Sequence, residues 1–172
     1  QEIWADRPEV ARGLAHEAAR GFERDSGASI ANALALSAAA AWLRGDRATA
    51  IADAERATAR LTGMVSFQMW PACDLATWTL IELWDEAKRH GRPDAPALRE
   101  MAVAACARAR SLSRTCKIGA PITARADGML ARVDGHPRRA RALLGDAVVA
   151  AKALAMPVVE VHARLELALL EP

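Results

Sequence analysis

The sequence predicts an all-α protein built from antiparallel helix pairs. Apolar residues recur at helical spacing almost throughout the 172 residues, and no stretch alternates with a period of two. The interruptions are short clusters of Gly, Pro and Asp, which are typical of tight turns between helices. Alanine dominates the apolar residues, whereas tyrosine is absent and phenylalanine occurs twice. This composition favours closely packed helices over strands.

About eight helices are predicted in order along the chain. Their ranges are 8–25, 28–44, 47–62, 69–90, 95–116, 121–134, 137–155 and 158–170. Prolines stand where a helix begins, the position at which a missing N–H costs least, and these are Pro8, Pro71, Pro137 and Pro157. Glycines that tolerate a left-handed conformation close the helices before them, and these are Gly45, Gly91 and Gly135. Each such glycine therefore predicts a turn between two helices.

The three glycines also indicate internal repetition, because they lie 46 and 44 residues apart and each interval holds two helices. Small residues recur at fixed offsets around two of them: Ala38, Gly45, Ala50 and Ala57 have the same spacing as Gly128, Gly135, Ala140 and Ala147. Two helices approach closely only where a small side chain meets the neighbouring backbone. The spacing predicts that the four alanines after the glycines are buried at helix crossings.

This spacing of small residues around a glycine turn resembles the core of the tetratricopeptide repeat (TPR). The opening helix resembles the second helix of a further unit, since Pro8, Ala11 and Ala18 mirror Pro137, Ala140 and Ala147. The sequence departs from the family in its period near 45 residues, against roughly 34 for a standard repeat, and in its missing signature aromatics. The pair around Gly91 also diverges, with Pro96 where alanine is expected. The resemblance implies a TPR-like α–α superhelix that forms a single domain over residues 1–172.

The tail from Ala140 to Leu170 is similar to helical arrays of large bacterial signalling proteins. These are LuxR-type ATP-binding transcription regulators, ATPase-linked nucleotide cyclases and some serine/threonine kinases. The similarity implies a sensor or regulatory arm of a longer protein, and the start at Gln1, inside a repeat, fits a fragment of one. Helices left without a neighbour at the two ends predict self-association through Leu165, Leu169 or the first helix.

Charge and cysteine content exclude several classes of function. The net charge of +2 comes from 23 basic and 21 acidic residues spread along the chain, so neither nucleic acid nor membrane is expected as a partner. Cys73, Cys106 and Cys116 form no even set and no CxxC pair, so no disulfide framework or zinc site is predicted. No apolar run approaches the roughly 18 residues of a membrane span, and no signal peptide is recognisable. These features predict a cytoplasmic protein.

Sequence signatures of enzymes are missing, so the chain is predicted to be non-catalytic and to need no cofactor or metal. It has no GxxxxGK[ST], GxGxxG, HExxH or GxSxG motif. None of the four histidines has a second ligand at helical spacing. Cys73 lies in a first helical turn, which favours a thiolate, but burial as a small apolar residue is the preferred interpretation. Arg138, Arg139 and Arg141 stand at the unfavourable end of their helix dipole and have no explanation from sequence alone.

A candidate binding groove lies along the predicted helix 69–90. At about 100° per residue, one stripe of this helix reads as core, and its members are Trp70, Cys73, Thr77, Leu80, Ile81 and Trp84. Trp78 falls beside the stripe among Asp74, Glu82 and Asp85, where it could bind a cationic group or an Arg-bearing peptide. Arg125 and Arg132, seven residues apart on the predicted helix 121–134, are expected to line the same groove. The alternative is that Asp74 and Asp85 pair with Arg125 and Arg132 and that Trp78 only packs.

Two functions from different classes remain open. The first is a scaffold that recognises a protein or peptide partner, or other domains of the same chain. The second is a sensor that closes the same groove on a metabolite. The sequence lacks a dense set of convergent polar groups, which favours the scaffold.

Overall fold

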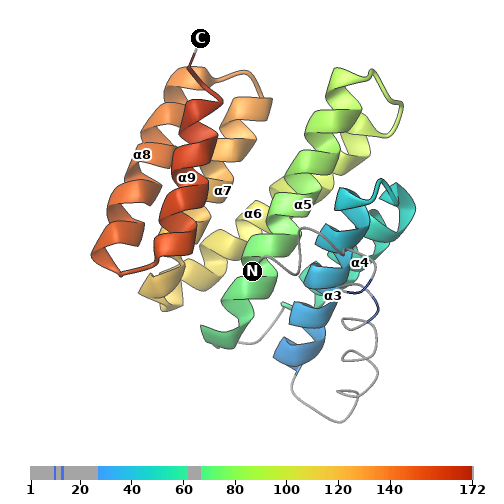
Figure 1. Cartoon of the computed structure of the whole chain (residues 1–172), viewed down its shortest axis with the longest axis horizontal. Helices are drawn as coiled ribbons and strands as arrows, with labels where there is room; N and C mark the ends of the chain where they lie inside the picture. The colour runs from blue at the N-terminus through green and yellow to red at the C-terminus, as the bar shows by residue number, and fades with distance from the viewer. Residues whose placement is uncertain (1–9, 11–12, 14–26, 62–66, 172) are drawn as a thin grey trace. The chain divides into compact units, whose positions relative to one another are not determined.

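The computed structural model describes residues 10, 13, 27–61 and 67–171, and these residues form seven α-helices, two short 3₁₀ helices and no strand (Figure 1). The prediction of an all-α fold is confirmed. Apart from Val10 and Gly13, the predicted helix 8–25 lies outside the described residues. The other seven predicted helices agree with the observed ones to within two residues at each end.

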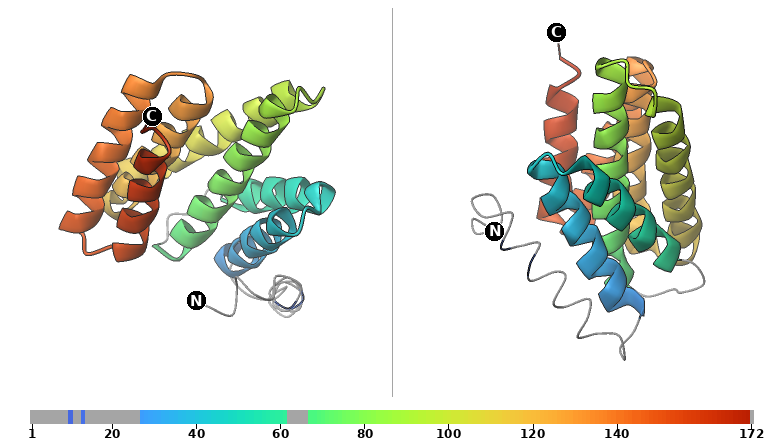
Figure 2. Two further views of the ribbon diagram at one scale, coloured as in Figure 1. Left: turned by 45° about the horizontal axis from the view of Figure 1, so that its top comes forward. Right: turned by 90° about the vertical axis from the view of Figure 1, so that its right-hand side faces the viewer.

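The chain divides into two compact units, residues 1–105 and 106–172. The first unit contains α3 (Gly27–Leu43), α4 (Arg47–Arg60) and α5 (Trp70–Arg89), which contact one another pairwise. In the second unit α8 (Pro137–Ala153) contacts both α7 (Ala120–Val133) and α9 (Pro157–Ala168), as the two views of Figure 2 also show. Helix α6 (Ala95–Thr115) runs from one unit into the other. The prediction of a single repeat domain stays a prediction.

Small residues allow the close packing of α3 on α4. Ala31, Ala35 and Ala38 of α3 are fully buried, as are Ala50 and Ala57 of α4. A buried polar pair lies in the same packing, since the Ser37 hydroxyl donates a 2.6 Å hydrogen bond to the Asp53 carboxylate. Arg56 donates to the other oxygen of Asp53 over 3.1 Å, so this acid is satisfied although its residue is only 3% exposed.

The same arrangement recurs between α7 and α8. Ala140 and Ala147 are fully buried, as predicted. A Cβ added at Gly128 of α7 would lie 2.6 Å from Cγ of Leu144, which is itself completely buried. The glycine is therefore required by the close approach of the two helices.

Four turns between helices share one pattern of backbone hydrogen bonds around a left-handed residue. The N–H of the left-handed residue donates to the carbonyl oxygen three positions before it. The N–H of the next residue donates to the carbonyl oxygen five positions before itself. For Gly135 these bonds reach Arg132 and Ala131 over 3.0 and 2.9 Å. Gly45, Gly91 and Gly135 have φ values of 76°, 59° and 85°, which confirms the three predicted turns. The fourth turn, between α8 and α9, places Ala155 at φ 52°. The sequence predicted a helix start at Pro157 but no left-handed residue before it, although Gly135 and Ala155 both stand two residues before a proline.

Candidate functional site

The predicted core stripe of α5 is confirmed. All six of its residues are buried, from Ile81 at 0% exposure to Trp70 at 6%. Trp78 and the three carboxylates beside it, Asp74, Glu82 and Asp85, are half-buried. The structure thus brings these four side chains to the border of the core, on one helix of the first unit.

Charges within α5 already compensate part of this acidic face. The Asp85 carboxylate lies 3.6 Å from the Arg89 guanidinium one turn later. The aromatic ring with neighbouring cations is that of Trp84, because Lys88 Nζ and the Arg99 guanidinium each lie 5.8 Å from its centroid. The spacing of Lys88 four residues after Trp84 could have indicated this contact. The binding of a cationic group to Trp78 stays a prediction.

The two arginines predicted to line the groove belong to α7 of the second unit. Arg132 lies 3.3 Å from a carboxylate oxygen of Glu166 on α9, so its ion pair joins two helices of its own unit. Arg125 is only 4% exposed. Pairing of either arginine with Asp74 or Asp85, which would join the two units, stays a prediction.

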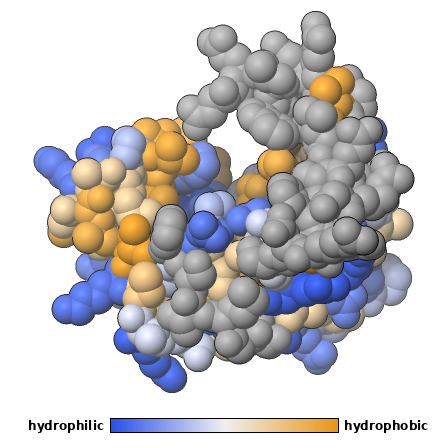
Figure 3. All heavy atoms as spheres, turned by 90° about the horizontal axis from the view of Figure 1, so that it is seen from below, coloured by the Kyte–Doolittle hydropathy of each residue, from blue (hydrophilic) through white to orange (hydrophobic). Residues whose placement is uncertain are grey.

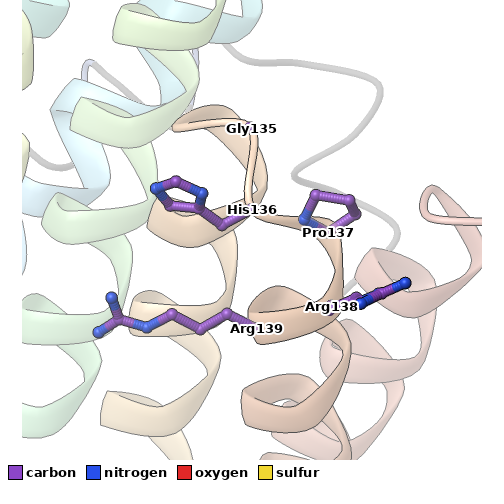
Figure 4. Close-up of a pocket in the computed structure, with 5 residues that line it drawn as sticks. All are labelled: Gly135, His136, Pro137, Arg138 and Arg139. Atoms are coloured by element: carbon purple, nitrogen blue, oxygen red, sulfur yellow. The ribbon is translucent and has the colours of Figure 1, made fainter.

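A pocket at the start of α8 is lined by Gly135, His136, Pro137, Arg138 and Arg139 (Figure 4). Three basic side chains at a helix N-terminus would suit an anion. However, His136 and Arg139 extend to one side of the helix and Arg138 to the other, so the three side chains do not converge on one point. The pocket therefore lacks the geometry that would hold a phosphate or carboxylate.

The structure explains two of the arginines that the sequence left without a role. Arg141 donates a 2.9 Å hydrogen bond to the carbonyl oxygen of Leu170, at the end of α9 where the helix dipole favours a cation. Arg139 acts on Asp127 of α7: burial raises the pKa of that carboxyl, while Arg110 and Arg139 oppose the rise. Both partners are distant in sequence, which is why no local spacing indicated them.

Two of the three cysteines, Cys73 and Cys106, are too deeply buried to offer a reactive thiol. Burial and the neighbouring Asp74 charge raise the pKa of the Cys73 thiol to about 12, against the predicted effect of the helix N-terminus. Cys106 is completely buried. Within the part of the chain that the structure describes, no cluster of three His, Cys, Asp or Glu side chains is placed to share a metal ion, and no helix is long and apolar enough to cross a membrane.

The exposed face of α9 carries a row of aliphatic side chains that we call the α9 stripe. Its members are Val158, Val161, Leu165 and Leu169, spaced three, four and four residues apart and 47–66% exposed. On the other face of α9, Val159 and Ala163 are buried in the unit. The helix is thus apolar on two faces, whereas a surface helix normally has one apolar face.

Exposed apolar side chains concentrate in this region. Of the nine large apolar side chains that are exposed among the described residues, six lie between Val149 and Leu169. Figure 3 shows hydrophobic side chains gathered over the end of the second unit where α8 turns into α9. The sequence predicted Leu165 and Leu169 at this surface; Val158 and Val161 complete the row and could have been found from their spacing.

Searches against known protein families, curated proteins and solved structures find no match to this chain.

Proposed function

We propose that the chain is a non-catalytic protein-interaction module, a TPR-like array that docks partner segments as part of a larger regulatory protein. The observation that carries the proposal is the α9 stripe. Four aliphatic side chains exposed by half to two-thirds present on the order of 400 Å² of apolar surface, the size of the largest apolar patch on a typical monomer, which is often functional.

Helical geometry supports a helical or extended peptide partner rather than a small molecule. The stripe is a convex row on one helix, and burying it needs an apolar surface of similar length. Small-molecule sites, in contrast, are concave and combine apolar walls with convergent polar groups. The acidic border of α5 around Trp78 is a second candidate surface of the same module.

A peptide-display selection tests the proposal directly. We expect a random library of 20-residue peptides, selected on the purified protein, to enrich sequences with apolar residues at helical spacing. The enriched peptides should lose binding to the Leu165→Glu variant and keep it on Leu43→Glu, which alters an equally exposed leucine on α3 of the first unit. If selection enriches nothing, while a metabolite screen raises the melting temperature, the interaction module is the wrong class and the sensor is favoured.

A further inference from the structure

We infer that the occupant of the α9 stripe is an amphipathic helix of a partner protein whose apolar row is bordered by carboxylates. This inference rests on the proposed function and adds the chemistry of the partner. It follows from the charges around the stripe and from the division of charge between the two units.

Two exposed cations, Arg164 and Arg141, and one exposed acid, Glu171, border the stripe. Arg164 adjoins Leu165 on α9 with 58% of its side chain exposed. Its partner Glu160, 2.6 Å away, is mostly covered, with 17% of its side chain exposed, so the guanidinium is the charge that a docking helix meets. At the C-terminal end of the stripe, the exposed Arg141 lies beside Leu170.

The net charge of the whole chain is close to zero, but basic and acidic residues are unevenly distributed between the two units. Residues 106–172 hold eleven Lys or Arg and six Asp or Glu, whereas residues 1–105 hold twelve basic and fifteen acidic ones. Charged residues are thus spread along the chain as expected, but the two signs are divided unevenly between the units. The unit that carries the stripe has an excess of five positive charges, and its field attracts an acidic partner over about one Debye length, roughly 8–10 Å.

The apolar area of the α9 stripe limits how tightly a partner can bind. A standard interface buries about 800 Å² on each partner, and the stripe supplies roughly half of that. The remainder must come from its polar border, where Arg164 and Arg141 contribute. We therefore expect micromolar binding that weakens as salt screens the border.

Three synthetic 20-residue helical peptides with the same leucine row test the inference. One has Glu beside the row, one has Lys, and the third has Gln. Fluorescence anisotropy of the labelled peptides should show the Glu peptide binding at least about 10-fold more tightly than the Lys peptide, with the advantage lost at high salt.

Variants of the whole chain locate the binding. Leu165→Glu should weaken binding of the Glu peptide at least about 30-fold and Arg164→Glu about 5–10-fold, while Leu43→Glu should stay within about 2-fold of the parent. Circular dichroism of each variant checks that the fold is kept. Because Leu165 and Arg164 are exposed, loss of binding would then report on the contact itself.

Each other outcome overturns the inference in its own way. Equal or tighter binding of the Lys or Gln peptide, still lost on Leu165→Glu, would keep the docking surface and refute an acidic occupant. Self-association at micromolar concentration that Leu165→Glu abolishes would make a second copy of the chain the occupant. If the Leu165→Glu variant binds the peptides as tightly as the parent, the α9 stripe is not the binding surface of the proposed function.

Discussion

Gly128 and Gly145 lie on neighbouring helices of the second unit and have different surroundings. A methyl group at Gly128 would collide with Leu144, whereas one at Gly145 would meet nothing within 4 Å. We predict that Gly128→Ala lowers the free energy of unfolding by about 1–3 kcal/mol through overpacking. Gly145→Ala should instead raise it by about 0.5–1 kcal/mol, because alanine is the better helix former. Urea denaturation of both variants measures the difference, and equal effects would refute the close approach of α7 to α8.

Cys73 and Cys116 differ in burial, and their reactivity should follow. With a pKa of about 12, the Cys73 thiol is almost entirely protonated at pH 8, so it is a poor nucleophile. Cys116 is half-exposed. We predict that iodoacetamide modifies Cys116 first in the folded protein, with all three cysteines reacting in urea. Peptide mass spectrometry gives the order, and early modification of Cys73 would contradict its burial.

At the scale of elements, Arg47 ties the start of α4 to the end of α5 and to the turn before α6. Its guanidinium donates to Glu86 and, over 2.7 Å, to Asp94. The hydrogen bond from Arg47 holds the pKa of the Asp94 carboxyl below its ordinary value. A lowered carboxyl pKa stabilises the fold at pH values above the ordinary value, and the stabilisation is lost as pH falls through the lowered one.

Substitution of the two shifted carboxyls should therefore change the pH profile in opposite directions. We predict that the Asp94→Asn variant loses less stability on acidification than the parent does. The difference should be below about 1 kcal/mol, because the Arg47–Asp94 pair is partly exposed. Asp127 has a raised pKa, so its ionisation destabilises the fold as pH rises, and Asp127→Asn should reduce that loss. Thermal unfolding between pH 3 and 7 checks both, and slopes of the same sign would refute the assignment.

Local patterns predicted the elements well and their long-range contacts poorly. Helical periodicity gave the bounds of seven helices, and the repeated alanines gave the buried crossings, since both depend on residues near in sequence. The α5 stripe followed from the same rule, but its groove required knowing what faces Trp78. The hydrogen bond from Arg141 to Leu170 spans 29 residues, and no periodicity encodes it. The break between the helices 137–155 and 158–170 was predicted, but the left-handed backbone of Ala155 was not, because that conformation was expected only at glycine.

At the scale of the whole molecule, the two candidate surfaces make separable predictions. Trp78 is half-buried next to a core stripe, so Trp78→Ala should lower the free energy of unfolding by about 1–3 kcal/mol through lost packing. Binding of the acidic peptide at the α9 stripe should be unchanged, because Trp78 is not one of the stripe's residues. Denaturation and anisotropy on the same variant measure the two effects.

The opposite result would assign Trp78 to the function. Unchanged stability with loss of binding to a cationic or Arg-bearing peptide would establish the groove around Asp74, Glu82 and Asp85. A second variant, Trp78→Phe, separates the two roles further, since it keeps most of the packing and weakens a cation–π contact.

The left-handed backbone of Ala155 makes this position sensitive to the chirality of its amino acid. An L-alanine at φ 52° costs about 1 kcal/mol, because its methyl group crowds the following carbonyl oxygen. The mirror-image residue, D-alanine, prefers this very region and still restricts the unfolded chain, which glycine does not. In the 172-residue chain, a synthetic segment that carries D-alanine at position 155 can be ligated to the recombinant remainder. The protein with D-alanine at position 155 should have a higher melting temperature than both the parent and Ala155→Gly. A D-amino acid would then stabilise the fold more than an L-amino acid or glycine at this position.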